Sequence, residues 1–320
     1  MPAGGDGYGL SVILRGVAHK PVITIVGAGN LANALAPALV AAGYRIDRIL
    51  SRDRSSSRKR AQALARRVGG KAAALGAPLS AGVLWLCVSD DAIRPCAQEL
   101  SRAGNWKGRV VLHSSGALSS DELAPLRRRG ASVASLHPMM TFVPGARVRM
   151  AEVPFAVEGD PAAVRLARRI VRDLKARAFT LSKRNKPLYH AFGSFSSPMV
   201  IATLAMAERV AAAAGVPARL RREVMLPIVR KTFSNFLEAS ANKAFSGPIA
   251  RGDVNTIRRH LKALKKVPDA REIYVALARS ALKTLPARNR RAVARILKSR
   301  QVGPQRSPMR WPSFSFLVLR

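Results

Sequence analysis

The chain has 320 residues, of which 55 are lysine or arginine and 18 are aspartate or glutamate, so its formal net charge is +37. This length allows two domains, each with a core of its own. No apolar stretch is long enough to span a bilayer, and two cysteines are too few for a disulfide framework. We therefore expect a cytoplasmic protein that has no membrane partner.

Such a positive charge would ordinarily suggest nucleic acid or an anionic membrane as the partner. The basic residues are, however, spread along predicted helices, for example at 58–60 and 127–129. They are not accompanied by a zinc pattern, an aromatic platform or a nucleic-acid-binding module. We interpret the charge as a compositional bias and expect no nucleic-acid partner. The segment after Glu272, which lacks any acidic residue, keeps that alternative open.

The stretch from Pro21 to Arg52 has the pattern of a dinucleotide-binding site. Residues 22–26 are apolar and mostly β-branched, which is typical of a buried parallel strand. Gly27 then allows a tight turn, Gly29 lets the backbone approach a pyrophosphate, and Ala32 allows close packing of helix and strand. The helix N-terminus offers free N–H groups to phosphates. The expected cofactor contacts here are Gly27, Ala28, Gly29, Asn30 and Leu31.

The end of the next predicted strand, residues 46–50, decides which cofactor is expected. An NAD site needs a carboxylate there for the ribose 2′-hydroxyl, whereas an NADP site needs arginine and hydroxyl groups for the 2′-phosphate. Ser51 and Arg52 follow the strand, which favours NADP. Asp53 keeps NAD as the alternative, because a shift of two residues would restore the carboxylate.

Further strands alternate with helices, and this pattern predicts a doubly wound, mostly parallel sheet. The predicted strands are 83–88, 109–112, 131–136, 155–157 and 178–181, and helices are expected over 55–67 and from 161 to about Arg177. Ligands bind at the carboxyl edge of such sheets. The polar residues expected there are Ser89 and Asp90, then His113 and Ser114 against the cofactor, and Ser115 and His137 towards the substrate. Neither histidine has metal-ligand spacing, so no metal is assigned.

After residue 183 the chain is predicted to be helical throughout. Pro227 should kink or restart a helix over 218–238, and 245–253 is predicted to be a loop because of its glycine, proline and polar residues. Asp253 or Asn255 can cap a helix that starts at Thr256, and a last pair of helices is expected near 269–282 and 287–298. The predicted organisation is a loose leader over 1–19, an NADP-binding Rossmann domain over 20–183, an all-α domain over 184–300 and a basic irregular tail over 301–320.

These segments together resemble a known family. The motifs are Gly27-Ala28-Gly29-Asn30, His113-Ser114-Ser115-Gly116-Ala117, His137-Pro138 with Thr141-Phe142, Tyr189-His190, and Gly247-Pro248-Ile249-Ala250-Arg251-Gly252-Asp253. They are similar to Rossmann-like proteins with a C-terminal domain of unknown function 2520, over about residues 20–285. The resemblance implies an NADP-dependent oxidoreductase related to pyrroline-5-carboxylate reductases, 3-hydroxyacid dehydrogenases and 6-phosphogluconate dehydrogenases. It also implies a homodimer through the helical domains and an active site between the two domains.

The related 3-hydroxyacid dehydrogenases place a lysine early in the first helix of the second domain. Lys186 and His190 are four residues apart here and would share one helix face. On this view Lys186 is the proton donor, and His190 is its partner or the donor itself. The alternative is that Lys186 is a surface cation and His190 only packs. Pro198 stands where the family has a polar asparagine, which puts that polar group in doubt.

Three residues are weaker candidates for substrate contacts. Arg251 could bind a carboxylate or phosphate, or pair with Asp253. Ser194 and Ser197 could donate hydrogen bonds to the substrate.

The sequence thus supports two functions. One is an NADP-dependent oxidoreductase acting on a small polar, anionic substrate. The other is an inactive dinucleotide-binding sensor or interaction protein.

Overall fold

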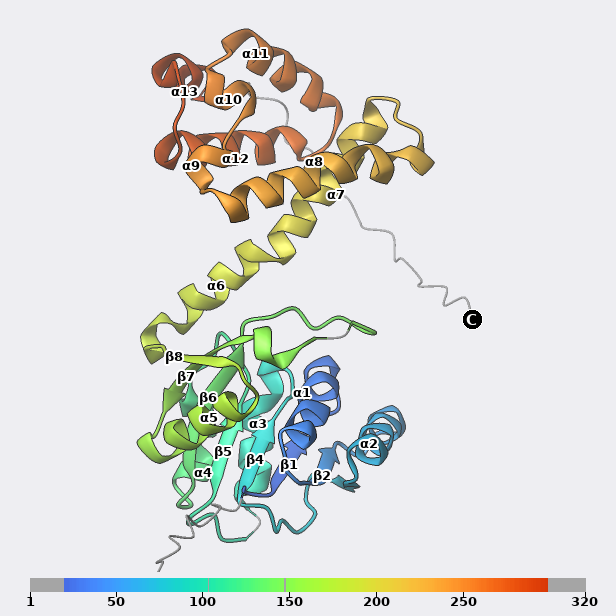
Figure 1. Ribbon diagram of the computed structural model, residues 1–320, viewed down its shortest axis with the longest axis vertical. Coiled ribbons are helices and arrows are strands. Elements are labelled where there is room, and N and C mark those ends of the chain that lie inside the picture. Colours follow the sequence, from blue (N-terminus) through green and yellow to red (C-terminus); the bar gives the residue numbers. More distant parts are fainter. Residues whose placement is uncertain (1–19, 103, 147, 299–320) are drawn as a thin grey trace, which may run out of the picture. The chain divides into compact units, whose positions relative to one another are not determined.

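The computed structural model describes residues 20–102, 104–146 and 148–298. The predicted leader over 1–19 and tail over 301–320 lie outside the described residues. By their internal contacts the described residues divide into two compact units, with the division between Met199 and Val200. The first unit holds the sheet and the second is made of helices (Figure 1).

The first unit contains an eight-stranded sheet in the order β3-β2-β1-β4-β5-β6-β7-β8. All neighbouring strands are parallel except β6 and β7, which are antiparallel. The predicted class, a doubly wound and mostly parallel sheet followed by helices, is therefore confirmed. The strands are β1 Ile23–Val26, β2 Ile46–Ser51, β3 Lys71–Ala74, β4 Val83–Leu86, β5 Val110–His113, β6 Ser132–Pro138, β7 Pro154–Gly159 and β8 Arg177–Thr180.

Helices cover both faces of this sheet, because successive side chains of a buried strand point to opposite faces. One core joins α1 (Asn30–Ala41), α2 (Ser55–Val68) and α5 (Pro161–Asp173) to side chains such as Trp85. The other joins α3 (Asp90–Ser101) and α4 (Ala124–Arg127) to side chains such as Leu86, on the opposite face. The carboxyl ends of the parallel strands stay uncovered by these helices, which leaves that edge for a site.

Two features of the sheet unit differ from the prediction. Strand β3 was not expected, because its sequence Lys-Ala-Ala-Ala has no β-branched residue, and only its pairing with β2 makes it a strand. Helix α5 ends at Asp173 and not near Arg177. Lys175 has a φ of 59°, a left-handed conformation that stops the helix, and Arg177 already begins β8.

The remaining helices follow in unbroken succession. They are α6 Lys186–Ser196 in the first unit, then α7 Pro198–Ala213, α8 Ala218–Glu238, α9 Ala241–Ala244, α10 Gly247–Arg251, α11 Val254–Ala263, α12 Ala270–Thr284 and α13 Arg290–Lys298. Helices α11, α12 and α13 share a small core that includes Ile257, Leu282 and Val293. Helix α8 runs through Pro227 without a restart.

The prediction of a loop over 245–253 was wrong, because Gly247–Arg251 is a short helix. Its proline lies at the helix start, where no N–H is needed, and Gly252 ends it with a φ of 68°. A side chain at Gly252 would lie 2.5 Å from the carbonyl oxygen of Arg288. The next helix begins at Val254, two residues before the predicted Thr256, and Asp253 caps it by accepting a bond from the Thr256 N–H.

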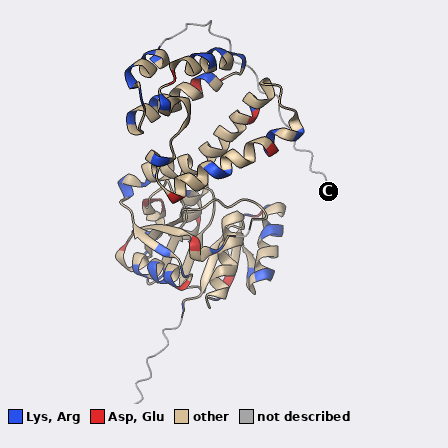
Figure 2. Cartoon of the chain, turned by 45° about the horizontal axis from the view of Figure 1, so that its top comes forward, with Lys and Arg blue, Asp and Glu red and all other residues tan. Residues whose placement is uncertain are grey.

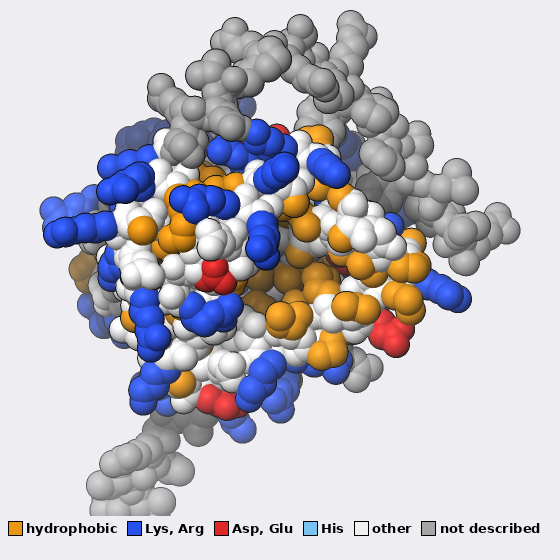
Figure 3. All heavy atoms as spheres, turned by 90° about the horizontal axis from the view of Figure 1, so that it is seen from above, with side chains coloured by type: hydrophobic (Ala, Val, Ile, Leu, Met, Phe, Trp, Pro, Cys, Tyr) orange, Lys and Arg blue, Asp and Glu red, His pale blue; other side chains and the backbone are white. Residues whose placement is uncertain are grey.

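The basic side chains are distributed over both units, as Figure 2 shows. The space-filling view shows hydrophobic side chains exposed among them (Figure 3). Both cysteines, Cys87 and Cys96, are buried and free. Within the described residues no helix has the length and hydrophobicity that a membrane span requires. The same part of the chain has no group of three or more metal-ligating side chains.

Candidate active site

The glycine turn at the end of β1 is shaped by one close contact and one open space. Gly27 has a φ of +100°, and a Cβ atom built on it would lie 2.5 Å from the carbonyl oxygen of Cys87. Only glycine fits this position. A Cβ atom built on Gly29, in contrast, meets nothing within 4 Å. The backbone at Gly29 is therefore open to a ligand.

Helix α1 begins directly after this turn. Gly29 is its N-cap residue, and no side chain caps the helix, so the first N–H groups are available for an anion. The side chain of Asn30 is engaged within the protein, because its amide donates a hydrogen bond to the carbonyl oxygen of Phe142 at 3.0 Å. Ala28 and Leu31 are half-buried and pack against the core. The backbone of this turn is what a phosphate would meet.

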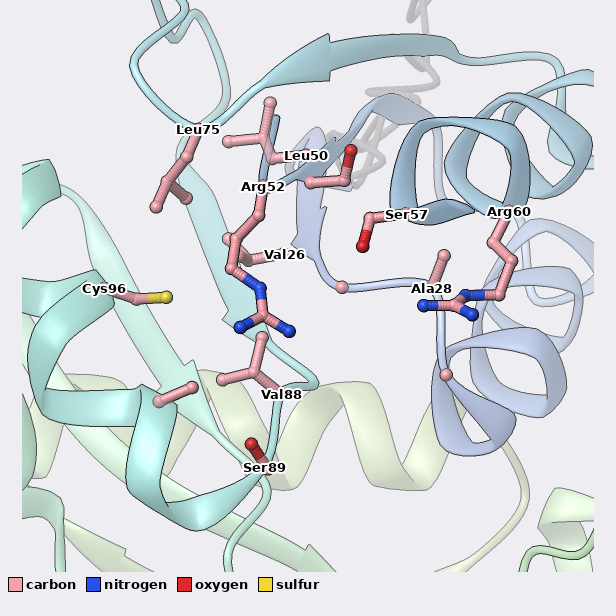
Figure 4. Close-up of a pocket in the computed structure, with 14 residues that line it drawn as sticks. Val26, Ala28, Leu50, Arg52, Ser57, Arg60, Leu75, Val88, Ser89 and Cys96 are labelled. Carbon is pink, nitrogen blue, oxygen red and sulfur yellow. The ribbon is translucent and has the colours of Figure 1, made fainter. Parts of the chain in front are cut away.

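A pocket that is lined by two arginines opens beside the turn. The side chains of Arg52 and Ser57 point into it, and Arg60 lies across from Arg52 (Figure 4). Its other lining residues are Val26, Gly27, Ala28, Gly29, Leu50, Ser51, Leu75, Val88, Ser89, Ala92 and Cys96. None of these is acidic. The cavity holds about 210 Å³, below the roughly 300 Å³ of a typical small-molecule pocket, so it can take one end of a dinucleotide.

The carboxylate that would favour NAD is directed elsewhere. Asp53 forms an ion pair with Arg58 at 3.3 Å, and its side chain is 80% exposed. It does not line the pocket that contains the glycine turn. Ser57 and Arg60 were not singled out from the sequence, although their positions two and five residues into α2, just after Arg52, could have suggested them. The pocket thus fits a phosphate on the ribose better than a free 2′-hydroxyl.

A second cluster of polar groups lies where β5 and β6 end. His113 is fully buried, and both of its ring nitrogens are engaged, Nε2 with Ser119 O at 3.0 Å and Nδ1 with Ser115 N–H at 3.1 Å. Burial lowers the pKa of His113 to about 3. His113 is therefore held inside the sheet unit, and its contact with the cofactor stays a prediction.

Lys186 is the most unusual member of this cluster. It is 1% exposed, and its ammonium group donates to Ser115 O at 2.9 Å and to Ser135 Oγ at 2.7 Å. Burial lowers the pKa of Lys186 to about 8, against the opposing influence of the charges on Glu158 and Asp90. The alternative of a surface cation is excluded by this burial. The structure also shows no pairing of Lys186 with His190, because the hydrogen bonds of the Lys186 ammonium group go to Ser115 O and Ser135 Oγ.

Three ring side chains, those of His137, Tyr189 and His190, form a cluster of their own. His137 Nδ1 is 3.0 Å from the hydroxyl of Tyr189, and the His137 and His190 rings meet edge to face at 6.4 Å. Burial, followed by the charges of Lys186 and His190, lowers the pKa of His137 to about 4. A Cβ atom on Gly116 would lie 2.8 Å from His137 Nε2 and 2.9 Å from His190 Cδ2. Gly116 thus leaves room for two histidines at one point.

Glu158 is a buried residue that the sequence did not indicate. Its carboxylate accepts from Ser120 N–H at 2.7 Å and from Ser120 Oγ at 2.9 Å. It lies on β7, 21 residues after His137, and the antiparallel pairing of β6 with β7 brings it into this region. Its negative charge favours the protonated form of Lys186. The same holds for Asp90, whose neighbour Ser89 lines the nucleotide pocket.

The structure gives the positions and hydrogen bonds of the other predicted site residues, and their roles stay predictions. Ser114 Oγ accepts from Trp85 Nε1 at 2.7 Å. Ser115 Oγ accepts from the N–H groups of Ala117 and Leu118. Ser194 donates back to His190 O within α6, Ser197 follows the last residue of that helix, and Pro198 begins α7. Arg251 ends α10 in the second unit.

Comparison with known families identifies both parts of the chain. Residues 16–138 match a Rossmann-like domain, and residues 153–281 match a domain of unknown function, DUF2520. The chain therefore combines a Rossmann-like domain with a DUF2520 domain. This confirms the resemblance stated from the motifs. No curated protein sequence matches the chain.

Solved structures are similar to this chain along most of its length. A provisionally named NADP oxidoreductase from Bacteroides fragilis has 25% identity and a TM-score of 0.69, covering 82% of this chain and 97% of that one. An imine reductase from Myxococcus stipitatus in complex with NADP+ has 16% identity and a TM-score of 0.59, covering 82% and 94%. A pyrroline-5-carboxylate reductase from Coxiella burnetii has 17% identity and a TM-score of 0.52, covering 88% and 100%. The similarity to the last two shows a common fold.

Proposed function

We propose that this Rossmann–DUF2520 protein is an NADP-dependent oxidoreductase that transfers a hydride to or from a small polar, anionic substrate. The observation that carries the proposal is the pocket beside the Gly27–Gly29 turn, which is lined by Arg52, Ser57 and Arg60 and by no acidic residue among those that the structure describes. The names of its structural relatives, an NADP oxidoreductase and an imine reductase in complex with NADP+, support the same cofactor.

In this proposal the chain's own residues bind and orient the cofactor. The open backbone at Gly29 and the uncapped N-terminus of α1 hold the pyrophosphate. Arg52 and Arg60 hold the 2′-phosphate through charge-assisted hydrogen bonds. The bound nicotinamide supplies or accepts the hydride.

Lys186 is the proposed group that holds the proton. An ammonium has three N–H groups, of which two are used for Ser115 O and Ser135 Oγ. The third is left for a substrate atom. With a pKa of about 8, Lys186 can be protonated near neutral pH and still release its proton. His190, which is exposed and lies one turn further along α6, is the second candidate for this role. An anionic substrate is favoured because the net charge of +37 attracts it.

The proposal is tested by titrating the protein with NADPH and, separately, with NADH, while nicotinamide fluorescence is followed. We expect NADPH to bind more tightly, and we expect Arg52→Ala to weaken NADPH at least tenfold while NADH changes little. Lys59→Ala is the matched control, because Lys59 is also exposed and basic on α2 but does not line the pocket. The absence of binding by either nucleotide would overturn the proposal.

A second candidate function is a dinucleotide-binding sensor without catalysis. It is favoured by the near-complete burial of Lys186 and by Pro198, which replaces the expected asparagine. Whether any substrate oxidises bound NADPH separates the two functions, and the Lys186→Ala variant then tests the role of Lys186. A reductase should lose turnover and keep its NADPH affinity. A sensor should show no turnover with any substrate in either form.

We also propose that two copies associate through the helical unit. Helices α7 and α8 have no buried residue, although they are 16 and 21 residues long. Apolar side chains on α8 are widely exposed, with Ile228 at 69% and Leu237 at 78%. Helices in water are stabilised chiefly by burying an apolar face, so this surface needs a partner. The dimers of the resembling families make a second copy of the chain the proposed partner.

A further inference from the structure

A concave basic surface lies within the helical unit, on the helices α11, α12 and α13. We define it as the basic pocket by the residues that line it, which are Arg258, Leu261, Lys262, Lys265, Arg271, Arg295 and Ile296. Five of these seven side chains are cationic and none is acidic. All of them belong to the second unit, so the pocket is separate from the glycine turn and from Lys186. Two of its lining residues, Arg295 and Ile296, belong to the segment after Glu272, which has no acidic residue.

The cations converge because of helix geometry and packing. Arg258, Lys262 and Lys265 follow each other at intervals of four and three residues, which places them on one face of α11 and the turn after it. Arg271 comes from the first turn of α12, and Arg295 comes from the last turn of α13. These three helices share a buried core that includes Ile257, Leu282 and Val293. The cations are therefore presented by a packed scaffold and not by loose segments.

Like charges at this spacing repel each other and destabilise a helix by a few tenths of a kcal/mol per pair. Arg258 donates to Asn255 Oδ1 at 3.1 Å, a neutral partner that leaves its charge uncompensated. A multiply charged anion would relieve the repulsion, and arginine side chains bind phosphate bidentately. The charge of this pocket thus selects for an anion with more than one negative group.

The size and lining of the pocket indicate a small molecule. The pocket has a volume of about 520 Å³, which lies within the roughly 300–1,000 Å³ of small-molecule sites. Leu261 and Ile296 contribute an apolar floor beside the charges. A nucleic acid would be expected to lie along an extended basic stripe with aromatic side chains for its bases. No aromatic residue lines this pocket in the part of the chain that the structure describes.

We propose that the basic pocket is a second ligand site, which binds a small molecule carrying a chain of two or more phosphate groups. This ligand is different from the dinucleotide of the proposed active site. The site would allow the concentration of a phosphorylated metabolite to act on the helical unit.

The test is calorimetric titration of the full-length protein with inorganic triphosphate in 150 mM salt, which screens exposed charges beyond about 8 Å. The pocket variant is Lys262→Gln with Arg295→Gln. The control variant is Arg259→Gln with Arg291→Gln, which removes the same charge from the same helices at exposed positions outside the pocket. We expect the pocket variant to weaken binding at least tenfold and the control variant less than threefold.

Four results would overturn the proposal. One is the absence of triphosphate binding to the unaltered protein. Another is an equal loss in both variants, which would mean diffuse attraction by the net charge. The third is pocket-dependent binding of a 12-nucleotide single-stranded RNA without binding of triphosphate, which would make the pocket a nucleic-acid contact. Binding that persists in the pocket variant would place triphosphate at Arg52 and Arg60, and it also counts against the proposal.

Discussion

Lys186 Nζ lies 2.7 Å from Ser135 Oγ, inside the protein and with both side chains almost fully buried. The two residues are on α6 and β6, and the same ammonium also bonds to the carbonyl oxygen of Ser115 on the loop after β5. One charged side chain therefore joins α6 to the middle of β6 and to the loop after β5. This arrangement makes Ser135 important even if it never touches a substrate.

We expect Ser135→Ala to lower the free energy of unfolding by about 1–3 kcal/mol, because it leaves a buried ammonium with one partner fewer. Urea unfolding followed by tryptophan fluorescence measures this, since Trp85 and Trp106 lie in the same unit. Ser132→Ala, at a half-buried position on the same strand, is the control and should change stability by less than about 0.5 kcal/mol. Equal effects of the two substitutions would mean that the bond to Lys186 contributes nothing.

The two glycines of the nucleotide turn should respond differently to alanine. Gly27→Ala places a Cβ atom 2.5 Å from a carbonyl oxygen at a φ of +100°, so we expect it to destabilise the fold by about 1–3 kcal/mol. Gly29→Ala meets open space, so we expect a change of less than about 1 kcal/mol in stability. NADPH affinity should nevertheless fall at least tenfold in Gly29→Ala. Unchanged NADPH affinity in that variant would show that the pyrophosphate does not approach Gly29.

Gly116→Ala should displace the two histidines that meet it. Its new methyl group would lie within 3 Å of both the His137 and the His190 rings. We expect the carbon-bound ring proton signals of these two residues to shift in NMR spectra, while that of His260, in the other unit, stays in place. NADPH affinity should remain within threefold. Unchanged signals for His137 and His190 would contradict the convergence of these groups on Gly116.

Acid should destabilise the sheet unit through its buried histidines. The folded-state pKa values of His113 and His137, about 3 and 4, lie below the ordinary value of 6.5. Below pH 6.5 the unfolded chain therefore binds more protons than the folded chain, and the stability falls as the pH drops through this window. The expected slope is at most about 1.4 kcal/mol per pH unit for each histidine.

This slope can be measured from urea midpoints between pH 7 and 5.5, above the range in which ordinary carboxylates titrate. The His113→Gln variant should be less stable overall and also less sensitive to pH in that window. A steeper slope in His113→Gln would contradict the prediction.

The exposed apolar face of α8 should control association. If two copies pack through the helical unit, Ile228→Glu places a charge in that interface and should weaken the dimer at least tenfold. Light scattering over a range of protein concentrations measures the molar mass. Lys231→Glu, also exposed on α8, is the control for the added negative charge. A monomer at all concentrations for the unaltered protein would reject the dimer.

The sheet and the nucleotide turn could be predicted from the sequence because their signals are local. A buried parallel strand needs an uninterrupted apolar run, and residues 22–26 and 83–86 have one. Gly27 and Gly29 are required by backbone conformation and approach, so they are visible as residue types. For the same reason Asp253, a side chain that bonds to a backbone N–H three residues on, could be named as a cap.

Only the tertiary structure decided which polar residues meet. Lys186 and Ser135 are 51 residues apart, and no pattern along the chain shows that an ammonium will be buried against that strand. His113 and His137 have equivalent places in the sequence, yet the loop after β5 turns back and engages both ring nitrogens of His113. Strand β3 and Glu158 likewise depend on pairing with a neighbouring strand. Local propensity determined the elements of this protein, and packing between distant segments determined its candidate site.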